Sequence, residues 1–266
     1  MAQFDNRYAV AGSATRTGAA VDEGLRSYML GVYNYMTAGI ALTGIVAYFL
    51  FTQAVTLDPA LAAKTATGGV MALKRGMYLT QLGMTLFASP VKWVVMLAPL
   101  GFVFFLSMRV HAMSVGAAQA SFWLFAAVMG VSLSSIFLVF TGQSIVQVFF
   151  VTAAAFAALS LYGYTTRKDL SGWGSFLIMG VVGILIAALL NIFLQSSALQ
   201  FAISVIGVLV FAGLTAYDTQ RIKDTYYEVA GDTAMASKMA IMGALSLYLD
   251  FINMFTSMLQ LFGDRE

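Results

Sequence analysis

Residues 239–262 read MAIMGALSLYLDFINMFTSMLQLF, and Asp250 is the single charged residue among them. A helix needs about 20 predominantly apolar residues to cross the hydrocarbon core of a bilayer, so this run is long enough to span a membrane. The run therefore predicts a transmembrane helix that carries one carboxylate near its middle.

Six more apolar runs precede this one along the chain. They predict spans, to within about four residues, near 28–51, 91–108, 119–140, 144–164, 174–194 and 198–218. Together the runs predict an all-α integral membrane protein, a bundle of seven transmembrane helices at residues 25–263. Residues 1–24 are polar and are expected to form a cytoplasmic tail. Because this tail lacks a continuous apolar segment, no cleaved signal peptide is expected.

The composition of the 266-residue chain agrees with a membrane protein. Hydrophobic residues make up 60% of it and charged residues 10%, which excludes a water-soluble core. The chain has no cysteine, and this excludes disulfides, thiolate metal sites and cysteine nucleophiles. A net charge of +2 is ordinary for a membrane protein and implies no nucleic-acid partner.

Turn-forming residues predict the connections between the spans. Thr141-Gly142-Gln143 and Gln195-Ser196-Ser197 each divide a continuous apolar stretch into two helices. The one long loop, about residues 53–90, is expected to be exposed and to include a surface-lying helix around residues 71–87. The sequence indicates no function for this loop.

The distribution of lysine and arginine predicts the orientation in the membrane. Cytoplasmic loops of membrane proteins carry the excess of these two residue types. Nine of the fourteen lie on the side of the amino terminus, and five lie on the other side. We therefore expect a cytoplasmic amino terminus and an external carboxyl terminus.

Asp250 is the first candidate functional residue. Ionisable residues in spans are costly in hydrocarbon, so they face the bundle interior and usually mark function. Steps of three and four residues place a polar set on the same helical face: Gly243, Ser246, Asp250, Asn253, Ser257 and Gln260. For the serines and the glycine, a helix-packing seam is the favoured interpretation. For Asp250 a functional role is favoured, and its partner must come from another helix or from water.

Asp218 is the second candidate, and several interpretations stay open for it. It is expected at the cytoplasmic end of the sixth span, where it is solvated, paired with Arg221 or Lys223 one turn on, or drawn into the polar interior. Arg109, at the end of the second span, is either a topological anchor or the counter-ion of Asp218. The nearby His111 is expected to be a solvated loop residue rather than a proton relay.

Two segments that carry these aspartates resemble the transmembrane Bax inhibitor motif family. They are SLYLDFIN at residues 246–253, followed by Phe262-Gly263, and YDTQRIK at residues 217–223. The resemblance extends from the first span to Gly263, although the other spans match the family mainly in hydropathy and length.

The resemblance implies a seven-helix bundle that acts, in bacterial relatives, as a pH-sensitive calcium leak in the inner membrane. It further implies that Asp218 and Asp250 form a proton-sharing pair in the pore, with a basic residue of the second span, here Arg109, beside them. Some relatives latch an acidic residue of that span to a basic one late in the last span. Ala98 and Gln260 stand at those places here, which argues against such a latch.

The chemistry of the two aspartates is compatible with this function. Two carboxylates held close in a low dielectric cannot both ionise cheaply, so the pair titrates as a unit and can act as a proton switch. Calcium prefers carboxylate and carbonyl oxygens, which Asp218, Asp250 and Asn253 can offer to an ion in transit. The expected partners are therefore the lipid bilayer, calcium ions and protons, with no cofactor.

Two other functions stay open. A proton-coupled transporter would use the same buried acids, and its flux would saturate at low substrate concentration. A regulatory protein would bind other membrane proteins, for example a quality-control protease, as the resemblance also suggests. An enzyme is not expected, because an intramembrane serine protease needs a histidine deep in the bundle and the only histidine, His111, lies at a helix end.

Overall fold

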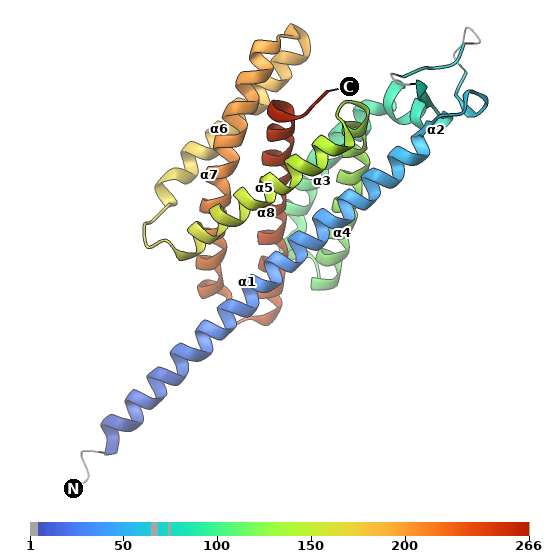
Figure 1. Ribbon diagram of the computed structural model, residues 1–266. Helices are drawn as coiled ribbons and strands as arrows, with labels where there is room; N and C mark the ends of the chain where they lie inside the picture. Colours follow the sequence, from blue (N-terminus) through green and yellow to red (C-terminus); the bar gives the residue numbers. More distant parts are fainter. Residues whose placement is uncertain (1–4, 65–68, 74–75, 266) are drawn as a thin grey trace.

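A computed structural model describes residues 5–64, 69–73 and 76–265, and long helices dominate it (Figure 1). The long helices are α1 (Asp5–Ala54), α3 (Val91–Arg109), α4 (Val115–Leu133), α5 (Gly142–Thr165), α6 (Ser171–Leu194), α7 (Ser197–Val229) and α8 (Thr233–Phe262). Within the described residues, seven helices are long and apolar enough to cross a membrane. This confirms the predicted all-α bundle of seven transmembrane helices.

The two ends of the chain lie at opposite ends of the bundle, as an odd number of crossings requires (Figure 1). Which end faces the cytoplasm stays a prediction. Helix α1 begins at Asp5, within the segment predicted as a polar tail, and its segment Glu23–Ala54 is long and apolar enough to cross a membrane. The first transmembrane helix thus continues out of the bundle toward the amino terminus as helix.

Both predicted tight turns divide helices where the sequence indicated. The Thr141 hydroxyl accepts a hydrogen bond from the Ser144 backbone N–H at 3.1 Å and caps the start of α5. The Ser196 hydroxyl caps α7 in the same way, and Gln195 takes a left-handed conformation (φ 49°) that ends α6. Such side-chain caps satisfy backbone donors that a helix start leaves free, so the turns do not depend on water.

The long loop differs from the prediction. The expected surface helix at residues 71–87 is wrong in its first part, because Tyr78–Leu79 (β2) pairs antiparallel with Val55–Thr56 (β1). Its second part is helical, as the short α2 (Gln81–Gly83) and the π-helical η3 (Met84–Ala88). Gly76 has a φ of 68°, which reverses the chain before β2 and interrupts any continuous helix. A short 3-10 helix, η1 (Pro59–Leu61), completes this loop.

Helices α7 and α8 are longer than their predicted spans. The sixth span was expected to end at residue 218, but α7 continues for about three more turns to Val229. The apolar run ends at residue 218. The helix continues beyond it, because charged and polar side chains can extend a helix outside the hydrocarbon. Helix α8 starts at Thr233 rather than near 239, and the Asp232 carboxylate caps it by accepting from two backbone N–H groups. Short 3-10 turns, η4 (Val110–Ala112) and η5 (Ser134–Leu138), extend α3 and α4.

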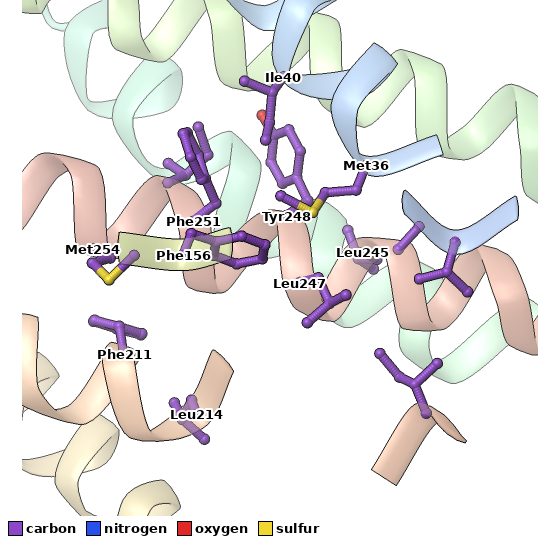
Figure 2. Packing of buried hydrophobic residues seen from close by; sticks show 14 of the residues in the cluster. Met36, Ile40, Phe156, Phe211, Leu214, Leu245, Leu247, Tyr248, Phe251 and Met254 are labelled. Atoms are coloured by element: carbon purple, nitrogen blue, oxygen red, sulfur yellow. The ribbon is translucent and has the colours of Figure 1, made fainter. Parts of the chain in front are cut away.

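Helix α8 forms the centre of the bundle and packs against α1, α4, α5 and α7. Figure 2 shows its buried side chains meeting Met36 and Ile40 from α1 and Phe156 from α5. Tyr248 of α8 is fully buried, and its hydroxyl lies 2.6 Å from the Thr43 hydroxyl of α1. Because Thr43 donates to the Ala126 carbonyl of α4, Tyr248 is the donor in that pair, and one hydroxyl chain joins three helices.

Candidate functional site

The polar face of α8 packs against α7 along its length. An Arg221 guanidinium nitrogen of α7 donates to the Ser246 hydroxyl of α8 at 3.3 Å. Toward the other end of the same interface, Gly207 of α7 faces Ser257, whose hydroxyl would lie 2.6 Å from a Cβ placed on the glycine. The polar stripe predicted from the sequence is therefore the seam between these two antiparallel helices, with small residues at the close approaches.

This register brings Asp218 and Asp250 to the same level of the seam. Asp218 precedes Arg221 by about one turn, and Asp250 follows Ser246 by about one turn in the antiparallel partner helix. Asp250 lies within electrostatic range of both Asp218 and Arg221. The two aspartates retain only 7% and 4% of their accessible surface, so both carboxylates are removed from bulk water.

Arg221 is the cation of the site. Its guanidinium lies 3.1 Å from an Asp218 carboxylate oxygen, one turn away on the same helix, while the same nitrogen also contacts Ser246. The Arg221 side chain is 48% exposed, whereas the Asp218 side chain is 10% exposed. The ion pair thus joins a buried anion to a cation at the edge of the bundle, with the α8 serine holding the guanidinium in place.

Asp250 has no comparable partner. Its Oδ2 atom is buried and has no hydrogen-bond partner among the residues that the structure describes. Asn253, one turn further along α8, turns its amide nitrogen to the Leu249 carbonyl of its own helix at 2.8 Å. Buried polar atoms are nearly always satisfied, and each exception needs an explanation. A shared proton, a water or a passing cation would each satisfy this oxygen.

A chain of hydroxyl groups, which the sequence did not reveal, ends at the residue that follows Asp218. Thr219, the residue after Asp218, donates to a backbone carbonyl of α7, so it accepts from the Ser160 hydroxyl of α5 at 2.9 Å. Ser160 in turn accepts from the Tyr33 hydroxyl of α1 at 2.5 Å. The chain crosses from α1 through α5 to α7, and only tertiary packing brings these three residues together.

The structure does not bring Arg109 to the two aspartates. Arg109 is exposed at the end of α3, and within the described residues no ion pair joins it to either carboxylate. The Lys238 ammonium group donates to the nearby His111 carbonyl, which places the end of α3 level with the first turns of α8. Lys238 precedes Asp250 by twelve residues, about 18 Å along the helix axis. Of the interpretations open for Asp218, pairing with Arg221 is confirmed, and Lys223 instead donates to the Tyr164 carbonyl.

Gln260, which stands where some relatives carry a basic latch residue, has a different contact. Its side-chain carbonyl oxygen accepts from the Arg265 guanidinium at 2.8 Å. The chain after α8 then folds back on the α4–α5 turn, where the Asp264 carbonyl accepts from the Thr141 backbone N–H at 3.0 Å. The residue at the latch position therefore holds the last turn of α8 to the end of the chain.

The site offers few ligands for a metal ion. Among the described residues, no group of three or more histidines, aspartates or glutamates is placed to hold a metal. Calcium takes six to eight oxygen ligands, and Asp218 and Asp250 supply two carboxylates. Backbone carbonyls and water would have to provide the remainder.

Comparisons with known proteins give a matching family model and similar proteins in several bacteria. A family model described as Inhibitor of apoptosis-promoting Bax1 matches residues 25–266, which include both aspartate-bearing helices. A protein of Caulobacter vibrioides is 43% identical over 266 residues and covers both chains completely. A protein of Rickettsia prowazekii is 41% identical over 96% of each chain, and inner membrane protein YbhL of Escherichia coli is 41% identical over 91% of this chain and 94% of its own.

Proposed function

The chain belongs to the family of the Inhibitor of apoptosis-promoting Bax1, and from this premise we propose that it is a pH-sensitive cation leak that passes calcium across a bacterial inner membrane. Asp218 and Asp250 form its proton switch. The observation that carries the proposal is the pair itself: two buried carboxylates lie at the same level of the α7–α8 seam within electrostatic range of each other, and Arg221 is the cation paired with Asp218.

The switch follows from counting charges at the seam. When the two aspartates share one proton, they carry one negative charge, which Arg221 neutralises, and α7 and α8 can stay closely packed. When that proton is lost, two negative charges share one cation, and a net charge remains in a low dielectric, where it is costly. The Ser246 hydroxyl, which contacts Arg221 at this site, is neutral and adds no charge. Loss of the proton therefore favours separation of the helices and entry of water and a cation.

The packed arrangement corresponds to the closed state in this proposal. Both aspartates are almost fully buried, so an ion reaches them only after α7 and α8 move apart. Arg221 can follow such a movement because half of its side chain already lies at the surface. A divalent cation is the natural replacement for Arg221 between two ionised carboxylates, since calcium is a hard cation that prefers carboxylate oxygens.

Calcium flux into liposomes containing the purified protein tests the proposal. We expect wild type to leak calcium slowly at acidic pH and faster as the pH rises. Asp250→Asn removes one titrating group from the pair, and Asp218→Asn removes the other, so each substitution should flatten this pH dependence. Asp169→Asn is the matched control, because Asp169 is exposed and lies outside the spans. It should keep the wild-type profile.

Two outcomes would contradict the proposal. If wild type and both seam variants are equally tight to calcium at every pH, the protein is not a leak, and a regulatory role through other membrane proteins becomes the better proposal. If flux instead saturates at low calcium concentration and follows an imposed proton gradient, a proton-coupled transporter is favoured. In that case the same aspartates would carry exchanged protons rather than gate a passive path.

A further inference from the structure

A long apolar groove runs between α1 and α5 on the side of the bundle. It has a volume of about 1040 Å³, and Phe251 of α8 lies at its base. Met36 and Ile40 line it from α1, and Phe156 lines it from α5, side chains that Figure 2 shows around the central helix. The groove thus reaches from the surface of the bundle to the residue that follows Asp250.

The groove opens toward lipid. Large apolar side chains beside it are strongly exposed, with Leu30 at 52%, Ile45 at 67% and Leu161 at 63% of their accessible surface. In a bilayer, such side chains contact acyl chains. From Arg26 to Ile45 the groove follows nineteen residue steps of α1, about 28 Å, which is close to the thickness of the hydrocarbon core.

An apolar space of this size will not hold ordered water, because water needs polar partners there. The hydroxyl groups of Tyr33 and Ser160 line the groove, but they bond to each other rather than to an occupant. An acyl chain from the surrounding bilayer matches the groove in polarity, shape and length. It is also present at high concentration along the whole open side.

The positive charge at one mouth of the groove favours an anionic lipid. Arg26 is the one charged residue among the described residues that line it, and its side chain is exposed. Lys223 donates to the carbonyl of Tyr164, another lining residue, at 3.0 Å, so a second cation lies near the same mouth. Two acidic residues, Asp22 and Glu23, precede Arg26 by about one turn in the sequence, and Asp224 follows Lys223 directly. None of the described acidic residues lines the groove.

We propose that the groove between α1 and α5 is a binding site for an anionic phospholipid, with the phosphate at Arg26 and an acyl chain along α5 toward Phe251. Arg26 lies at the end of α1 that is predicted to face the cytoplasm, so the lipid comes from the inner leaflet. Because the acyl chain would touch Phe251, next to Asp250, the lipid also supports the seam from its outer side. The site does not depend on ion conduction.

Lipid binding to the purified full-length protein tests the headgroup. Native mass spectrometry would compare phosphatidylglycerol with phosphatidylethanolamine carrying the same acyl chains. Each cation near a membrane surface contributes about fivefold in affinity for an anionic lipid, so Arg26→Gln should lower binding of phosphatidylglycerol by about fivefold and leave phosphatidylethanolamine unchanged. Arg167→Gln, an exposed arginine that does not line the groove, is the control. Equal effects of the two substitutions would overturn the headgroup assignment.

A matched pair of alanines tests the groove itself. Ala157 and Ala158 are adjacent, exposed residues of α5, and only Ala157 lines the groove. Ala157→Phe should obstruct the groove and reduce binding of both lipids severalfold, whereas Ala158→Phe should not. A photoreactive side chain at position 157 in native membranes should then capture phospholipid. Capture of a protein partner instead, or equal lipid binding by the two phenylalanine variants, would overturn the proposal.

Discussion

In soluble proteins the most apolar segments are the most buried, and the central helix α8 and the peripheral helix α6 show the opposite. In α6, the most apolar of the seven spans, 6% of the residues in the most apolar window are buried. In α8, which is much less apolar, 67% are buried. A hydrophobic helix surrounded by lipid loses nothing by staying exposed, because acyl chains are as apolar as its side chains. For these two helices, the higher hydropathy goes with contact with lipid, and the higher polar content goes with burial.

The two helices are accordingly held by different contacts. Helix α8 has packing partners on several sides and a buried hydrogen bond from Tyr248 to Thr43. Helix α6 packs mainly on α7, where Gly174 and Gly180 let Tyr217 and Val210 approach closely. Since association in lipid depends on packing and hydrogen bonds, substitutions in the two helices should differ strongly in cost.

The largest difference is expected for two aromatic residues. Tyr248→Ala should lower the free energy of unfolding by about 3 kcal/mol, because it leaves a cavity in the core and removes the hydrogen bond that Tyr248 donates to the Thr43 hydroxyl. Phe193→Ala in α6 should change it little, since Phe193 is 86% exposed. Reversible unfolding of both variants in the same detergent would measure the difference. Similar losses would mean that α8 is not the centre of stability.

A pair of glycines sharpens the same comparison. A Cβ on Gly163 of α5 would lie 2.2 Å from the Ala216 carbonyl oxygen of α7, so Gly163→Ala must push two backbones apart. Such overpacking costs about 2 kcal/mol. Gly183 of α6 has open space around its Cα, and Gly183→Ala should be neutral or slightly stabilising. Equal melting temperatures of the two variants would show that α5 and α7 can separate without cost.

The sequence predicted most of the architecture, because each span has to satisfy the bilayer on its own. Seven apolar runs gave seven helices, and the short polar turns at Thr141 and Ser196 were recognisable from their capping chemistry. The strand at Tyr78–Leu79 was missed, because its pairing with Val55–Thr56 is a contact between distant residues that no local pattern records.

The candidate site was predicted in part, and for a similar reason. Asp250 and Asp218 stood out because a charge in a span is costly, and the spacing of three and four residues correctly indicated a polar seam. Whether Arg109 or Arg221 is the counter-ion of Asp218 depended on how far α3 and α7 extend relative to α8. Hydropathy does not determine this. The hydroxyl chain through Ser160 gave no signal either, since serine is common in membrane helices for packing alone.

Removing a charge at the α7–α8 seam should also affect stability in a pH-dependent way, whereas removing one from an exposed loop should not. Arg221→Gln leaves the buried Asp218 carboxylate without its cation and should cost about 1–2 kcal/mol at neutral pH, a value reduced by the exposure of Arg221. The loss should shrink in acid, because a protonated Asp218 no longer needs the cation. Arg167→Gln, in the loop before α6, should have little effect at either pH. A pH-independent loss for Arg221→Gln would indicate that its packing, not its charge, stabilises the seam.

The smallest effect is expected at the start of α6. The hydroxyl and the backbone N–H of Ser171 donate to Asp169 and hold the pKa of its carboxyl below the ordinary value. A lowered pKa means that the charged form stabilises the fold above the unfolded pKa, and this stabilisation is lost as the pH falls below about 4. Asp169→Asn should therefore be slightly less stable than wild type at neutral pH, and the difference should vanish in acid. A difference that grows in acid would contradict this sign, and a large one at neutral pH would mean that the edge of the bundle depends on charge as strongly as the α7–α8 seam does.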